Sequence, residues 1–348
     1  MPRRRPLQRL VVAGVFLGAT LLACGIFAVA AADSKPLWRP VLRVNEPVDL
    51  AGPRSDGRLV VATTGVSGGL LSLWQPLGPL SPFARGPGGY SSASGEPYIA
   101  VAPRRVFRSL HCSFGRDSVY AIDQSAAPGV IKMTRRGVVS RFAELPPGSL
   151  PEGITFDRIG RFGHRLLIAA RVGASTTVFG VDCRRGLHTF ARGAPPVEGG
   201  IAVAPPGFGR FTGELIMADE VSGNVYASSA AGKTRLVVNS GTPSGGDTGV
   251  ESLGFVPATF RKHRFRAFVA SAHGDSNFGP GTRAILALGP RALQRTGIRP
   301  GDLLGVSELA GTTVAIHCVR RCSSRTVAGG PAAGHIEGHV VFAPATGS

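Results

Sequence analysis

Glu198-Gly-Gly-Ile-Ala-Val-Ala-Pro205 is the stretch that decides the expected fold, because its pattern recurs along the chain. The other full copies are Glu96-Pro-Tyr-Ile-Ala-Val-Ala-Pro103 and Glu337-Gly-His-Val-Val-Phe-Ala-Pro344, and partial copies begin at Glu46, Glu152 and Glu251. Each copy centres on a few β-forming residues bounded by proline or glycine. This pattern predicts a short buried strand with a glutamate carboxylate at its start.

Further short strands are expected after each copy. In two units they fall at 166–170, 177–181 and 187–190, and at 214–218, 224–227 and 234–238. Four strands in a unit is the content of one propeller blade. The first five copies begin at 46, 96, 152, 198 and 251, close to the ~40–50 residues of known blade repeats. The sequence therefore predicts an all-β fold, a β-propeller.

The end of the ring is less regular than its beginning. The distance from Glu251 to Glu337 is too long for one blade, so we expect strands near 313–317 and 325–328 to belong to this interval. The C-terminal motif and an early strand near 41–44 would complete the last blade. We predict six blades, with five or seven as the alternatives.

Composition narrows the class of protein. The 348 residues include 39 Lys and Arg against 21 Asp and Glu, a formal charge of +18, and most of the basic residues are scattered arginines. Without a basic helix or a basic run interleaved with aromatics, nucleic-acid binding is not expected. The 49 glycines and 27 prolines would interrupt long helices.

The N-terminus carries an export signal. Residues 10–32 are uncharged and follow the basic start MPRRRPLQR, so we expect a hydrophobic helix in a segment 1–32 that is a signal peptide or a signal anchor. A third alternative is a lipoprotein acylated at Cys24. All three place the propeller domain, residues 33–348, outside the cytoplasm, with contact to the membrane only through the N-terminal segment. We expect a secreted or membrane-anchored monomer.

Four further cysteines fit an oxidising compartment. Cys112, Cys183, Cys318 and Cys322 allow three pairings. Disulfides are favoured over zinc, because there is no second closely spaced pair and His317 alone does not complete a site.

Two hairpins and one opening carry a family resemblance. Asp117-Ser-Val-Tyr-Ala-Ile-Asp123 and Gly223-Asn-Val-Tyr-Ala227 resemble hairpins of NHL-repeat propellers and of the senescence-marker/gluconolactonase family, and Pro151-Glu-Gly-Ile-Thr-Phe-Asp157 resembles the opening of gluconolactonase-like proteins. The resemblance implies a central divalent cation, usually Ca²⁺, that serves lactone or phosphoester hydrolysis. By motif, the Glu that binds the cation in this family corresponds to Glu152, with Glu198 as the second candidate. The Asn and Asp ligands have no matching motif, although Asp219, Asn224, Asp275 and Asn277 lie in turns.

The repeated glutamates predict a ring of carboxylates near one axis. Such a ring must bind a cation, recruit arginines or hold protons, and hard oxygen donors favour Ca²⁺ or Mg²⁺. The metal candidates are Glu152 and Glu198, with Glu96, Glu251 and Glu337 as further ones. Alternatively, the glutamates are latches that accept backbone N–H groups of a neighbouring blade. His335, Glu337 and His339 alternate along one strand and could form a transition-metal or general-base site.

Two functions follow. The first is an extracytoplasmic binding or scaffold protein with a central Ca²⁺, whose partner is a protein, a glycan or a small molecule. The alternative is a Ca²⁺-dependent lactonase or esterase in which Asp219 or Asp275 acts as base. An enzyme should have asymmetric polar residues around the channel, whereas a scaffold should repeat the same residue types in every blade.

Overall fold

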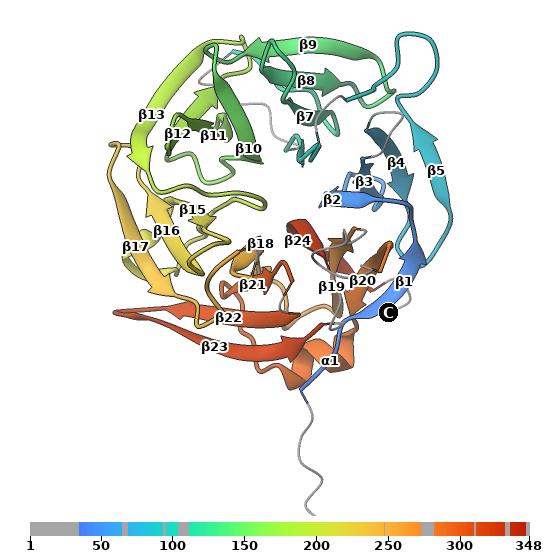
Figure 1. The fold of residues 1–348 in the computed structure, drawn as a ribbon. Helices are drawn as coiled ribbons and strands as arrows, with labels where there is room; N and C mark the ends of the chain where they lie inside the picture. The colour runs from blue at the N-terminus through green and yellow to red at the C-terminus, as the bar shows by residue number, and fades with distance from the viewer. Residues whose placement is uncertain are drawn as a thin grey trace, which may run out of the picture. The chain divides into compact units, whose positions relative to one another are not determined.

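The motif copies mark the innermost strands of a ring of sheets. The computed structural model describes residues 35–64, 69–92, 95–103, 111–246, 248–272, 282–309, 311–330 and 335–345. Each motif glutamate lies within or just before one of the strands that surround the centre of the ring (Figure 1). These strands are β2 (Pro47–Ala51), β6 (Ile99–Val101), β10 (Ser149–Phe156), β14 (Ala202–Val203), β18 (Val250–Phe255) and β24 (Ile336–Pro344).

Four sheets contain four antiparallel strands each, in chain order from the centre outward. The first is β2, β3 (Leu59–Thr63), β4 (Leu70–Trp74) and β5 (Leu80–Phe83), and the second is β6, β7 (Val119–Asp123), β8 (Gly129–Met133) and β9 (Val139–Glu144). The third is β10, β11 (Leu166–Val172), β12 (Ser175–Val181) and β13 (Leu187–Ala194), and the fourth is β14, β15 (Leu215–Ala218), β16 (Asn224–Ser228) and β17 (Thr234–Asn239). The strands predicted in the third and fourth units are confirmed.

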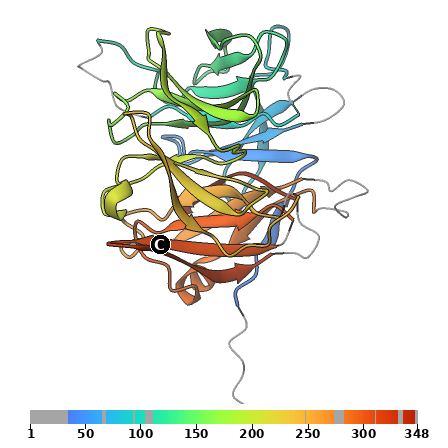
Figure 2. The ribbon, with the colours of Figure 1, turned by 60° about the vertical axis from the view of Figure 1, so that its left-hand side comes forward.

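A fifth sheet has eight strands in the order β1-β20-β19-β24-β18-β21-β22-β23. Its remaining members are β1 (Arg39–Arg43), β19 (Phe265–Ser271), β20 (Ala284–Leu288), β21 (Leu303–Ser307), β22 (Thr312–Cys318) and β23 (Cys322–Gly329). A single parallel pair, Leu253 with His339, joins β18 to β24, while the other pairings are antiparallel. The early strand β1 and the C-terminal strand β24 share this sheet, as predicted, so strands from both ends of the described chain lie in one sheet (Figure 1 and Figure 2).

The all-β, propeller-like prediction is confirmed. In the described ranges helix is limited to α1 (Pro290–Arg295) and the 3₁₀ turn η2 (Gly209–Phe211). The hydrophobic helix expected within 1–32 lies outside the described residues. Among the residues that are described, no helix is long and apolar enough to span a bilayer.

The sheets pack face to face through apolar side chains that alternate along the strands. Between the second and third sheets, Phe114 meets Phe156 edge-on with ring centroids 4.9 Å apart. Between the fifth and first sheets, Trp74 of β4 meets Phe268 of β19 at 5.1 Å in the same geometry. Burial of apolar surface, at about 25 cal/mol per Å², thus holds neighbouring sheets together and leaves the inner strands around a central channel.

Both pairs of cysteines form disulfides. Cys112, which precedes β7, is bonded to Cys183 after β12, and this bond links the second and third sheets. Cys318 is bonded to Cys322 across the β22–β23 turn. The disulfide prediction is therefore confirmed, and these cysteines are not zinc ligands.

Candidate metal centre

Glutamates from different sheets converge on one buried tyrosine. The hydroxyl of Tyr98, which is fully buried, lies 2.8 Å from Oε1 of Glu251. It also lies 3.1 Å from Oε2 of Glu96 and 3.1 Å from Oε2 of Glu337. A phenol has one hydrogen to donate. At most one of these carboxylates can therefore receive it at a time.

A histidine bridges two carboxylates on one side of this group. Nε2 of His335 lies 2.7 Å from Oε1 of Glu308 and 2.7 Å from Oε1 of Glu337. Oxygen and nitrogen atoms of these three residues lie within 4.8 Å of one another, and so do carboxylate oxygens of Glu220, Glu251 and Glu308. Glu308 belongs to both sets and connects them. We call Glu96, Glu198, Glu220, Glu251, Glu308 and Glu337, together with Tyr98 and His335, the acidic cluster.

Burial makes ionisation of the cluster costly. Desolvation raises the pKa of Glu198 to about 12, with further contributions from a hydrogen bond to Glu96 and from its charge. Desolvation, followed by the charge of Glu337, raises the pKa of Glu251 well above its usual value. The pKa of Glu337 is raised too, first by burial and then by Glu96. Without a cation, the cluster therefore holds protons at neutral pH.

Glu152 lies at the edge of the cluster and has its own cation. Nη2 of Arg171 on β11 lies 2.7 Å from its Oε1. Burial nevertheless raises the pKa of Glu152 to about 7, because it outweighs the attraction of Arg171 and because Glu220 and Glu96 add repulsion. Arg171 is thus an arginine that neutralises one glutamate of the ring, one of the three ways expected from the sequence. Glu46 similarly lies 3.6 Å from Nε of Arg283.

The predicted site residues are distributed unevenly. Glu96, Glu198, Glu251 and Glu337 come together in the cluster, while Glu152 is paired with Arg171. Asp219 accepts hydrogen bonds from Val221 N at 2.9 Å and from Ser222, so it shapes the turn after β15. Its neighbour Glu220 is the residue that joins the cluster. Asp275 and Asn277 lie outside the described residues.

The predicted His335, Glu337 and His339 set divides in two. His335 and Glu337 meet in the acidic cluster. His339 instead lies with Nδ1 3.0 Å from both carboxylate oxygens of Asp49, which is fully buried. Between them Gly338 adopts φ of +68°, and a side chain there would collide with Asp49. Because Gly338 is in the left-handed region, side chains on either side of it do not alternate between the two faces of the strand as in a regular strand.

Asp49 and backbone groups link neighbouring inner strands. Oδ2 of Asp49 on β2 accepts the N–H of Ile99 on β6 at 2.7 Å, and Oδ1 accepts the N–H of His339 on β24 at 2.8 Å. The backbone carbonyl of Glu152 accepts Gly199 N at 2.9 Å, and that of Glu251 accepts Gly200 N at 3.1 Å. Here the glutamates link neighbouring sheets through their backbone carbonyls. The side chain that accepts backbone N–H groups of neighbouring inner strands is that of Asp49.

Sequence reasoning missed Tyr98, Glu220 and Glu308. A signal existed for the first, because the third position of the motif is Tyr98 in one copy and His339 in another, where a third copy has Gly200. Glu308 directly follows β21 and Glu220 lies in a hairpin turn. Neither belongs to a motif, so only the tertiary structure brings them to the centre.

The chain was also compared with known proteins. No protein-family model and no curated protein matches it. Among solved structures, a regucalcin from Agrobacterium tumefaciens, described as a calcium-binding protein, is 11% identical over 88% of this chain and 82% of its own, with a TM-score of 0.48. A putative gluconolactonase is 13% identical over 86% of this chain and 95% of its own, with a TM-score of 0.46. A chain of a nidogen/laminin complex is 11% identical over 85% and 84%, with a TM-score of 0.49. At these identities and TM-scores the comparison assigns neither a family nor an activity to this chain.

Proposed function

We propose that this chain is an extracytoplasmic binding propeller whose acidic cluster holds one divalent cation, Ca²⁺ by preference. The observation that carries the proposal is the convergence of Glu251 on β18, Glu337 on β24 and Glu96, which precedes β6, on the single hydroxyl of Tyr98. The hydroxyl can donate to only one of the three carboxylates at a time, so protons or a bound cation would satisfy the others.

The donor set fits a hard cation. Ca²⁺ takes about six to eight oxygen ligands, and carboxylates can bind it through one or both oxygens. Glu220, Glu251 and Glu308 supply carboxylate oxygens within 4.8 Å of one another, and Glu337 approaches Glu308 through His335. A bound cation would stabilise the charges that burial otherwise opposes.

Six blades are part of the same proposal. The eight-stranded sheet has two inner strands, β18 and β24, and each carries a motif copy. They are joined by one parallel pair, Leu253 with His339. Dividing the sheet at this pair gives β18-β21-β22-β23 and β24-β19-β20-β1, two further blades of four strands.

The location outside the cytoplasm is supported by two features. The disulfides Cys112–Cys183 and Cys318–Cys322 are typical of oxidising compartments. The basic start and the apolar segment 10–32 are typical of an export signal. On this proposal the bound partner is an extracellular protein, a glycan or a small molecule, and the chain acts as a monomer.

Asymmetry at the centre favours one second candidate, a cation-dependent hydrolase of lactones or esters. The motif places a glutamate within or just before every inner strand, but Glu308, Glu220 and His335 add polar groups next to Glu251 and Glu337 that have no counterpart in the motif. The cation would polarise a substrate carbonyl. His335, held between Glu308 and Glu337, is then the group able to carry a proton, in place of Asp219, which shapes a turn.

Calorimetric titration of chelator-treated protein, residues 33–348, with CaCl₂ tests the proposal. We expect saturable binding that the double variant Glu251→Gln/Glu337→Gln loses. Glu144→Gln is the matched control, because Glu144 on β9 is exposed and outside the cluster. Equal binding by the wild type and the double variant would contradict the site. A lactone and ester screen of the calcium-loaded protein, with His335→Ala as the variant, separates the two functions.

A further inference from the structure

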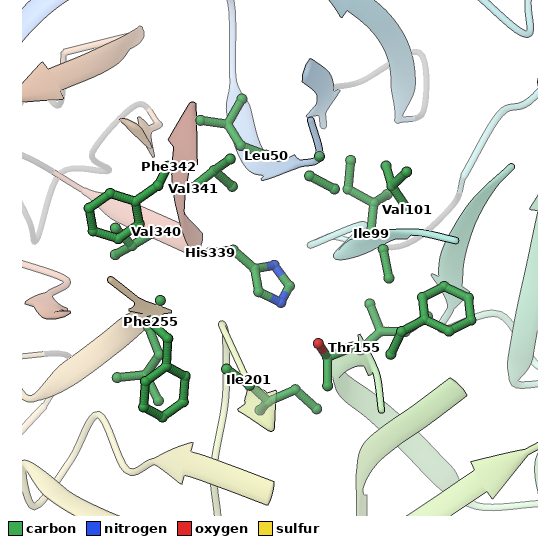
Figure 3. A pocket seen from close by; sticks show the side chains of 18 of the residues that line it. Leu50, Ile99, Val101, Thr155, Ile201, Phe255, His339, Val340, Val341 and Phe342 are labelled. Atoms are coloured by element: carbon green, nitrogen blue, oxygen red, sulfur yellow. The ribbon is translucent and has the colours of Figure 1, made fainter. Parts of the chain in front are cut away.

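The inner strands enclose a cavity of about 430 Å³ that does not belong to the acidic cluster. Apolar side chains form much of its wall, among them Leu50, Ile99, Ile201, Val340, Phe255 and Phe342 (Figure 3). Along each inner strand the cavity residues follow the glutamate, as Ile154, Thr155 and Phe156 follow Glu152. The parallel pairing of β18 and β24 shows two of these strands running in the same direction. The cavity therefore occupies the end of the channel away from the acidic cluster.

His339 forms the inner end of this cavity. Its imidazole projects toward the middle of the ring of strands (Figure 3). Nδ1 faces the carboxylate of Asp49, and the ring also forms hydrogen bonds to the backbone of Ile154 and Ile201 on other sheets. The imidazole at the inner end is thus already engaged by Asp49 and by backbone groups.

An arginine lies at the mouth of the cavity. Arg158, two residues beyond Phe156, lines the cavity and is exposed. Its Nη2 donates to the carbonyl oxygen of Val101 at 3.1 Å, which holds the guanidinium beside the cavity wall. Partial desolvation by the surrounding protein lowers the pKa of the Arg158 guanidinium. A guanidinium has five N–H donors, so one bond to Val101 leaves donors for an anion.

The charge and the volume of the cavity together indicate which class of ligand it can bind. Among the described residues that line the cavity there is no aspartate or glutamate, while Arg158 and His339 are both basic. The volume falls within the roughly 300–1,000 Å³ of small-molecule pockets, which are mostly apolar with a few polar groups that orient the ligand. Because the N–H groups of His339 are engaged, the anion must be recognised at the mouth.

We propose that this cavity binds a small amphipathic anion, a medium-chain carboxylate, with its carboxylate on Arg158 and its apolar chain directed toward His339. An Arg–carboxylate pair is favoured where water is partly excluded. The apolar chain would displace water from walls made of isoleucine, valine and phenylalanine side chains. This site is separate from the proposed cation site, and neither depends on the other.

The test uses decanoate, with 1-decanol and decyltrimethylammonium as neutral and cationic probes of equal chain length. Calorimetry should show saturable 1:1 binding of decanoate, weaker binding of decanol and none of the cation. Arg158→Gln should weaken decanoate binding by about tenfold, as expected for loss of a charged hydrogen bond, and leave decanol unchanged. Arg161→Gln, which removes an exposed arginine three residues further on, is the matched control.

A second variant tests the location. Thr155 points into the cavity (Figure 3), so Thr155→Phe should fill it and remove binding of both decanoate and decanol. Every titration is repeated in EGTA, where we expect the same affinity. Absence of saturable decanoate binding would overturn the proposal, as would equal binding by wild type and Arg158→Gln. Binding that requires calcium would assign the ligand to the acidic cluster instead.

Discussion

The hydroxyl of Tyr98 lies 2.8 Å from Oε1 of Glu251, although the two residues are separated by 153 positions in the sequence. The contact joins β18 to the segment that precedes β6, across the centre of the ring. Glu337 and Glu96 approach the same hydroxyl at 3.1 Å. The contact therefore marks the point where the glutamates of separate motif copies meet and where we propose the cation.

The first prediction concerns the sign of a stability change. In EGTA at pH 7.5, Glu251→Gln should raise the melting temperature, because it removes a buried carboxylate that must otherwise be protonated or left unpaired. With calcium in excess the same variant should melt below the wild type, because it lacks a ligand. Differential scanning calorimetry in both buffers gives the comparison. A variant that is destabilised equally in both buffers would show that Glu251 has a structural role only.

Proton release should accompany cation binding. The raised pKa values of Glu198, Glu251 and Glu337 mean that the cation-free cluster carries protons at pH 7. Ligand carboxylates bind a metal in the ionised form, so binding must expel protons. Calcium titrations in buffers of different ionisation enthalpy should report about one or more protons released per ion. An enthalpy that is independent of the buffer would rule out this protonated cluster.

Glu152 should give the cation-free protein a pH-dependent stability. Its folded pKa of about 7 lies above the usual 4.5, so the folded state binds more protons than the unfolded state between these values. The stabilisation is complete below about pH 4.5 and is lost as the pH rises through 7, by an amount on the order of 3 kcal/mol. Denaturant unfolding of wild type and Glu152→Gln at pH 5 and pH 8 in EGTA measures this. The Gln variant should lose less stability over the interval, and equal losses would contradict the shift.

Asp49, which lies outside the acidic cluster, should be sensitive to substitution. It accepts the N–H groups of Leu50, Ile99 and His339 and faces the imidazole of His339. Asp49→Asn should lower the free energy of unfolding by about 3 kcal/mol, since it leaves the buried imidazolium without a counter-charge. The loss should be largest below the usual pKa of histidine and should shrink as the pH rises through the raised pKa of His339.

The control for Asp49 is Asp56→Asn. Asp56 forms an exposed ion pair with Arg58 at 2.8 Å, and such pairs contribute about 1 kcal/mol or less. Urea unfolding at pH 6 compares the two variants. Similar losses for both would show that the link between β2, β6 and β24 adds little to stability.

Much of the fold could be predicted because one motif repeats. The Glu-x-x start followed by a short β-forming run marks all the inner strands, from β2 to β24, and the strands that follow are bounded by glycine turns. The register of the fifth sheet could not be predicted. It depends on one parallel contact between Leu253 and His339, which no local pattern encodes.

The candidate site could be predicted only in part. The motif identified Glu96, Glu198, Glu251 and Glu337, because pseudo-symmetry brings equivalent positions together. It also favoured Glu152, which the structure pairs with Arg171. Glu308 and Glu220 enter from outside the motif, and a sequence shows neither that they are buried nor which carboxylates they face.

Elemental analysis of residues 33–348, purified in calcium and dialysed against metal-free buffer, tests the central claim most directly. We predict about one Ca²⁺ per chain in the wild type and in Glu144→Gln, and none in Glu251→Gln/Glu337→Gln. A wild-type protein that retains no metal and takes up none on titration would contradict the cation site, and the buried glutamates would then be groups that hold protons in the centre of the ring.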